Sequence, residues 1–98
     1  MAIKQHNPLH PGEFIKQVYL EPYELGSNQV ARKLKVSPST FNRLINCKSD
    51  VSPDMALRLS KVIGRSPESW LQMQDNYDLH KASSSIDLEK LESISFAA

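Results

Sequence analysis

Residues 29–45 read QVARKLKVSPSTFNRLI and carry the strongest structural signal in the chain. Two short helices joined by a tight turn cross closely at a steep angle, which requires a small side chain at the contact and an apolar side chain in the turn. Ala31 and Val36 meet these two requirements. Phe41 and Leu44 supply apolar anchors one turn apart on the second helix. The stretch therefore predicts a helix-turn-helix.

Three Ser-Pro pairs, at residues 37–38, 52–53 and 66–67, mark helix starts on both sides of this turn. A serine side chain accepts a hydrogen bond from an unpaired N–H at the N-cap, and proline fits the first helical position. Two more helices fit upstream, one opened by Pro11 and one with Ser27 as its N-cap. The expected helices are 11–21, 28–35, 38–46, 53–63 and 67–79. We therefore expect an all-α, five-helix domain with no β-strand.

The apolar positions of these helices recur at helical spacing and define the expected core. Trp70 is expected inside it, although Trp70 with Tyr77 could instead form a surface for another protein. The core side chains expected in the five helices, in order, are Phe14, Ile15, Val18 and Tyr19; Val30, Ala31 and Leu34; Phe41, Leu44 and Ile45; Met55, Ala56, Leu59, Val62 and Ile63; and Trp70, Leu71, Met73 and Tyr77.

The composition changes after His80. A serine run at residues 83–85 resembles a flexible joint, and apolar residues of helix-like period alternate with acids over 86–94. We expect a helix-turn-helix domain over 8–80 and a flexible tail with a short amphipathic segment over 81–98. An isolated helix of that length is marginal in water, so the segment packs on the domain, packs on a second copy, or stays mobile.

Charge is distributed unevenly along the 98 residues, although the net charge is only +1. Residues 25–49 hold five basic side chains and no acidic one, whereas residues 66–98 hold six acids against two lysines, a net charge of −4. A basic middle indicates a face that binds a polyanion, and an acidic end indicates a separate surface for a partner.

The outer face of the helix that begins at Ser37 is the candidate reading surface for DNA. Arginine can bond guanine with two hydrogen bonds and asparagine can bond adenine in the major groove. The residues expected to face the bases are Ser39, Thr40, Asn42, Arg43 and Asn46. Gln29, Ser37 and Lys48 are expected near phosphates. The alternative is an ordinary solvated helix face.

Other function classes find little support in the sequence. The single cysteine, Cys47, excludes an intrachain disulfide, and the chain has no cluster typical of metal ligands. It has no glycine-rich phosphate loop, paired catalytic carboxylates or nucleophile motif. No run approaches the roughly 20 apolar residues of a membrane span. We expect a cytoplasmic, non-enzymatic protein without cofactor, metal or membrane contact.

Four further motifs carry a resemblance to a known family: HPGE at 10–13, LEP at 20–22, VSPDMALRL at 51–59 and SWLQMQDNYDL at 69–79. With the helix-turn-helix, they make the chain similar to lambda-repressor-like (Xre-type) proteins over residues 8–80. More narrowly, it resembles the HigA-type antitoxins, which include virulence-associated protein I. The resemblance implies a homodimer that binds operator DNA, represses its own toxin–antitoxin operon and neutralises a RelE-like, mRNA-cleaving toxin.

The chain departs from this family at Lys35 and Cys47, which lie on either side of the expected helix 38–46 and where glycine is usual in the family. If both positions keep a left-handed backbone, each side chain costs on the order of 1 kcal/mol. The fold is expected to survive this cost.

Two other functions stay open on the sequence alone. One is a stand-alone or phage-type repressor without a toxin. The other is a protein-interaction module in which the helix-turn-helix is only a scaffold. Because the reading helix must stay free for DNA, dimerisation is expected through the fifth helix and the tail. Toxin contact is expected through the acidic end.

Overall fold

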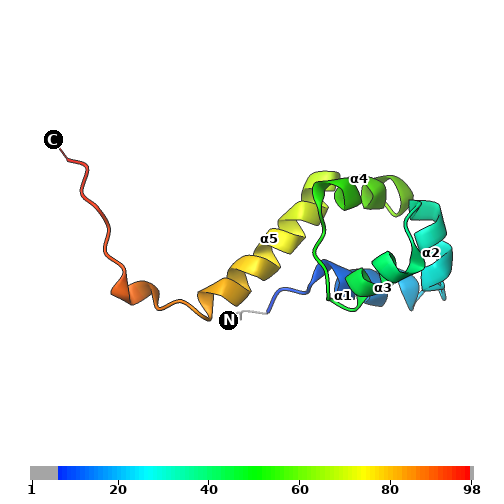
Figure 1. The fold of residues 1–98 in the computed structure, drawn as a ribbon, viewed down its shortest axis with the longest axis horizontal. Helices are drawn as coiled ribbons and strands as arrows, with labels where there is room; N and C mark the ends of the chain where they lie inside the picture. Colours follow the sequence, from blue (N-terminus) through cyan, green and yellow to red (C-terminus); the bar gives the residue numbers. More distant parts are fainter. Residues whose placement is uncertain (1–6, 98) are drawn as a thin grey trace.

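The computed structural model describes residues 7–97. In this range the chain forms five α-helices and no strand, which confirms the all-α prediction. The helices are α1 (Pro11–Ile15), α2 (Ser27–Leu34), α3 (Pro38–Ile45), α4 (Pro53–Val62) and α5 (Pro67–Ser83). Figure 1 shows α1 to α4 gathered at one end, while α5 runs away from them toward the C-terminus.

All three Ser-Pro pairs begin helices as predicted. The hydroxyl oxygens of Ser37, Ser52 and Ser66 each accept a hydrogen bond, 3.1 Å long, from the N–H three residues further on. Each following proline occupies the first helical turn. The start of α2 differs by one residue from the prediction, because Gly26 is the N-cap and Ser27 is already helical.

A π-helical turn follows α1 directly and spans Lys16–Leu20. The N–H of Glu21 donates to the carbonyl of Lys16 over 3.0 Å, a spacing of five residues instead of four. The extra residue in the turn rotates the side chains that follow. Leu20 is therefore 6% exposed in the core, whereas Val18 is 39% exposed. The prediction that Val18 faces the core is wrong for this reason.

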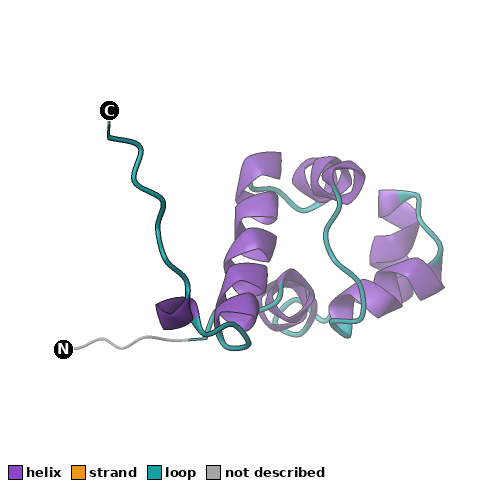
Figure 2. Ribbon diagram, turned by 60° about the vertical axis from the view of Figure 1, so that its left-hand side comes forward, coloured by secondary structure: helices purple, strands orange, loops and turns teal. Residues whose placement is uncertain are grey.

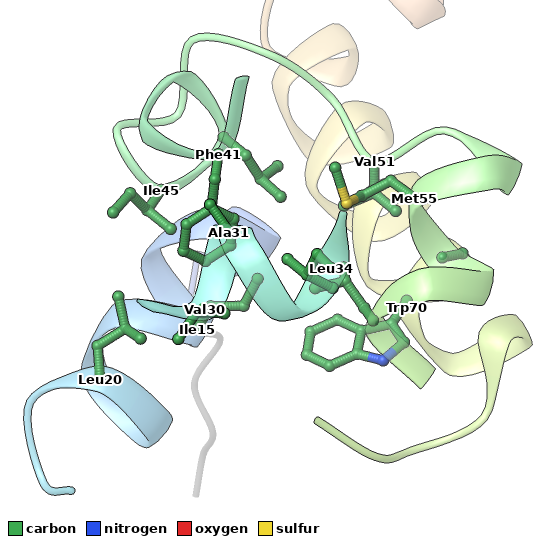
Figure 3. Packing of buried hydrophobic residues seen from close by; sticks show 13 residues of the cluster. Ile15, Leu20, Val30, Ala31, Leu34, Phe41, Ile45, Val51, Met55 and Trp70 are labelled. Carbon is green, nitrogen blue, oxygen red and sulfur yellow. The ribbon is translucent and has the colours of Figure 1, made fainter. Parts of the chain in front are cut away.

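Trp70 is part of the buried core that joins the helices (Figure 3). It is completely buried, and its indole N–H donates to the carbonyl of Gly64 over 2.9 Å. The rings of Phe14 and Tyr19 pack against it at centroid distances of 6.0 and 6.5 Å. The prediction of Trp70 as a core residue is confirmed.

The end of α5 and the tail extend away from this core. Helix α5 continues to Ser83, beyond the predicted end near Leu79, because no helix breaker lies between them. Residues 84–97 form one 3-10 turn, Leu88–Lys90, and otherwise no helix, leading away from the domain in Figure 2. The exposed apolar side chains in this part are Leu79, Ile86, Leu88, Leu91, Ile94 and Phe96. The expected amphipathic segment is thus not packed on its own domain.

None of the helices in residues 7–97 combines the length and the apolar composition that a membrane span needs.

Candidate nucleic-acid interface

The turn between α2 and α3 is closed by two backbone hydrogen bonds around a left-handed residue. Lys35 has φ 62° and ψ 39°. Its N–H donates to the carbonyl of Arg32 over 3.2 Å, and the N–H of Val36 donates to the carbonyl of Ala31 over 3.1 Å. This pair of bonds is the Schellman ending of a helix, which glycine favours. The left-handed backbone anticipated at Lys35 is therefore present.

The same ending closes α3. Cys47 has φ 62°, and its N–H donates to the carbonyl of Leu44 over 3.0 Å. The N–H of Lys48 donates to the carbonyl of Arg43 over 2.8 Å. Both borders of α3 thus use a left-handed residue with a Cβ, each at a cost of about 1 kcal/mol. The turns hold because packing and hydrogen bonds around them offset that cost.

Helix α3 presents two chemically distinct faces. Phe41, Leu44 and Ile45 belong to the core and are at most 7% exposed; Figure 3 shows Phe41 and Ile45 within the cluster. The opposite face consists of polar side chains. Ser39, Thr40, Arg43 and Asn46 are exposed and Asn42 is half-buried. The structure therefore brings all five expected base-reading residues onto one side of α3.

Hydrogen bonds within this face restrain several of its side chains before any ligand binds. The Ser37 hydroxyl donates to Thr40 Oγ1 over 2.8 Å while it caps the helix. The Asn46 amide donates to the carbonyl of Asn42 over 2.8 Å. Arg43 Nη2 donates to the carbonyl of Lys48 over 3.3 Å, which occupies one of the five guanidinium donors. Enough donors stay free on Arg43 for a two-bond contact with a base.

Gln29 lies apart from the other expected site residues. It lines an apolar depression together with Tyr19, Leu20, Val30 and Ile63, among others. The role of Gln29 at a phosphate stays a prediction, and this placement gives it less support than the others have.

Two residues that the sequence reasoning passed over lie beside the start of α3. Asn28 and Arg32, one helical turn apart on α2, line a shallow depression together with Val36 and Pro38. The signal for them was available in the sequence, because Val30, Ala31 and Leu34 define the inner face of α2. A projection from that face places Asn28 and Arg32 on the side next to α3.

The basic side chains in and near the helix-turn-helix have no neutralising partners. The basic side chains of residues 25–49 are Arg32, Lys33, Lys35, Arg43 and Lys48, and all five are exposed. None of them forms an ion pair with another described residue, since the ion pairs of this part of the chain are His10–Asp50 and Arg58–Asp54. Lys33 lines the same depression as Gln29, whereas the other four keep their positive charge for a partner of α3.

His10 anchors α1 beneath the end of α3. Its Nδ1 accepts a hydrogen bond, 2.9 Å long, from the N–H of Gly12, which requires a neutral ring with the proton on Nε2. That Nε2 is buried, lies 3.9 Å from Asp50 Oδ1 and has no hydrogen-bond partner among the described residues. Burial lowers the pKa of His10 below its ordinary value of 6.5, although the nearby Asp50 and Asp78 carboxylates oppose this shift.

We expect the chain to lose stability as the pH falls below 6.5, because His10 binds a proton more readily in the unfolded state than in the folded state. Protonation of Nδ1 would also remove the acceptor for Gly12. One such proton accounts for at most about 1.4 kcal/mol per pH unit. Urea unfolding at pH 7.0, 6.0 and 5.2 measures the slope.

His10→Asn should flatten this slope, since asparagine can cap the helix but does not titrate in this range. His80→Asn is the matched control, because His80 is exposed on α5. It should keep the slope of the native chain. Equal slopes in the native chain and in His10→Asn would contradict the assignment to His10.

Within residues 7–97, no group of three or more histidine, cysteine, aspartate or glutamate side chains comes together in a way that could hold a metal ion.

Comparison with known proteins gives matches over most of the chain. No family model matches it. Virulence-associated protein I of Dichelobacter nodosus is 40% identical over 74 residues, which cover 76% of this chain and 68% of that protein. Antitoxin HigA-1 of Vibrio cholerae is 33% identical over 79 residues, covering 81% and 74% of the two chains.

A solved structure adds a DNA complex to this comparison. Antitoxin HigA of Pseudomonas aeruginosa, determined with the higBA promoter, superposes with a TM-score of 0.80 at 30% identity. The match covers 90% of this chain and 99% of that one. The helix arrangement described above is thus shared with a protein solved on promoter DNA.

Proposed function

We propose that this chain, which belongs to the HigA-type antitoxin family of helix-turn-helix DNA-binding repressors, binds the operator of its own operon as a homodimer. We also propose that it neutralises a RelE-like, mRNA-cleaving toxin. The proposed binding to DNA rests on the outer face of α3, which is polar and has no acidic side chain. The fold that it shares with an antitoxin solved on promoter DNA supports this assignment.

In this proposal α3 enters the major groove with its polar face toward the bases. Ser39, Thr40, Asn42, Arg43 and Asn46 read base edges, with Arg43 on a guanine. Because phosphate contacts position a protein and base contacts specify the sequence, the residues at the edges of the face take the first role. Those are Ser37 and Lys48, with Asn28 and Arg32 beside the start of α3.

A homodimer explains the unpartnered apolar surface beyond the core. Leu79 on α5 is 67% exposed, and Leu91 and Ile94 in the tail are 65% and 73% exposed. This surface lies on the side of the molecule away from α2, so two copies joined there leave both α3 helices free (Figure 1). The operator then has two half-sites about 10 bp apart, or a multiple of that distance.

Toxin binding is assigned to the acidic end of the chain. An mRNA-cleaving enzyme binds a polyanion and is expected to be basic, and residues 66–98 carry a net charge of −4. Leu88 lies between Asp87 and Glu89, and Phe96 follows Glu92; both apolar side chains are exposed and supply contact area.

Two measurements test the dimer and the toxin separately. Footprinting of the DNA upstream of the gene should give two protected half-sites, and a single protected half-site would contradict the dimer. Co-expression with the product of each neighbouring gene should yield, for one of them, a stable complex that does not cleave mRNA. Failure of every neighbouring product to bind would contradict the antitoxin assignment while leaving repression intact.

A further inference from the structure

Arg58 of α4 contacts the turn of the helix-turn-helix. Its Nη1 donates to the carbonyl of Leu34 over 2.8 Å and lies 3.4 Å from the carbonyl of Lys35. Its Nε donates to Asp54 Oδ1, one turn earlier on α4, over 2.6 Å. The side chain of Arg58 is 37% exposed, whereas that of Asp54 is 73% exposed. Arg58 therefore ties α4 to the end of α2 across 24 residues of sequence.

The two carbonyls that Arg58 contacts are ones that a helix leaves unsatisfied at its C-terminus. Lys35 holds the left-handed backbone of the turn, so its carbonyl direction depends on a conformation that its own Cβ disfavours. A guanidinium has several donors in one rigid plane and can serve a carboxylate and a carbonyl at once. The hydrogen bond from Nε to Asp54 restrains that plane.

This contact acts on the point where α3 begins. Only Val36 separates Lys35 from Ser37, the N-cap of α3, so the direction of the Lys35 backbone sets the direction of the recognition helix. We propose that Arg58, oriented by Asp54, is a positioning residue for DNA recognition: it holds the end of α2 and so sets the angle at which α3 meets the major groove. This inference rests on the proposed function of DNA binding.

A competing explanation makes Arg58 a plain phosphate contact. The two explanations predict opposite signs for Asp54→Asn. Removing an acid near DNA strengthens binding if only charge matters. If Asp54 orients Arg58, the same change weakens operator binding, because the turn loses part of its support. The sign of this single effect therefore decides between them.

The chain offers a matched control for Asp54. Glu68 follows Ser66 and Pro67 in α5 as Asp54 follows Ser52 and Pro53 in α4. It lies in the first turn of its helix, and no hydrogen bond joins it to an arginine among the described residues. Glu68→Gln thus reproduces the loss of one acid at a helix start. Lys61→Met, an exposed cation on α4, is the control for loss of positive charge at Arg58.

The binding test titrates the full chain against its upstream DNA and against a scrambled duplex, at a temperature where circular dichroism shows every variant folded. Asp54→Asn should weaken operator binding about 3-fold or more, and Arg58→Lys and Arg58→Met about 10-fold, with less change on scrambled DNA. Glu68→Gln and Lys61→Met should not reduce the preference for the operator. Native or tighter operator binding by Asp54→Asn, or full activity of Arg58→Lys, would overturn the proposal.

Amide hydrogen exchange tests the same contact without DNA. The N–H groups of Lys35 and Val36 close the turn, and both should exchange at least several-fold faster in Arg58→Lys and Asp54→Asn. The N–H of Ser69, which donates to the N-cap hydroxyl of Ser66 at the start of α5, should be unaffected. If these N–H groups exchange faster in the variants but the native chain shows no preference for the operator, the DNA-binding function is refuted. The conclusion that Arg58 stabilises the turn would then still stand. Unchanged exchange would refute that conclusion itself.

Discussion

Gly12→Ala is expected to lower the free energy of unfolding by about 3 kcal/mol or more, a large share of the roughly 5–15 kcal/mol of a typical domain. Gly12 is buried in α1, where that helix crosses the end of α3. A Cβ at this position would lie 1.7 Å from the carbonyl oxygen of Leu44 and 2.9 Å from the Cα of Ile45. Backbone atoms cannot rotate away, so α1 would have to move off α3.

Urea unfolding followed by circular dichroism measures this loss. Gly26→Ala is the matched control, because nothing lies within 4 Å of its added Cβ and its φ of −81° suits any residue. Alanine is a weaker N-cap than glycine, so a change below about 1 kcal/mol is expected there. If Gly12→Ala unfolded within 1 kcal/mol of the native chain, the close crossing of α1 and α3 would be wrong.

Arg43→Ala is expected to weaken operator binding roughly 10- to 100-fold and to relax the preference for one base pair in each half-site. A two-bond contact between arginine and guanine is worth about 1–3 kcal/mol of discrimination. Arg43 is exposed at the middle of the polar face, and its contact with the Lys48 carbonyl uses a single donor. Affinities for a set of operators with single base changes measure the effect.

Lys48→Ala is the matched control for Arg43, since both changes remove one positive charge from the same end of α3. In the proposed function Lys48 contacts a phosphate and no base. Its loss should weaken binding to every sequence alike, about 3- to 10-fold, and reduce the salt dependence by the equivalent of one contact. If both variants lost affinity without any change in base preference, the division of roles between them would be wrong.

Features set by neighbouring residues could be predicted from the sequence. The three serine caps depend on residues three positions apart, and each forms as expected. The left-handed backbone at Lys35 and Cys47 follows from the resemblance to a family with glycine at those positions. The burial of Trp70 follows from its size and helical phase.

Features set by tertiary contacts could not be predicted in the same way. The π-helical turn that exposes Val18 depends on how α1 meets the core, which periodicity alone does not encode. The role of Gly12 appears only when α3 crosses it, and Arg58 reaches a carbonyl 24 residues away. Gln29 and Asn28 line different depressions. The helical phase of α2 already separates the two side chains, so the sequence could have predicted this difference.

The most direct test of the central claim is a titration of the full chain against two duplexes of equal length and composition, its own upstream DNA and a scrambled sequence. We expect binding to the upstream DNA at least about 100-fold tighter than to the scrambled duplex. We also expect a steep loss of affinity for both duplexes between 50 and 200 mM salt, because each subunit makes several phosphate contacts. Equal affinity for both duplexes, or no binding at low salt by a folded protein, would refute sequence-specific DNA binding.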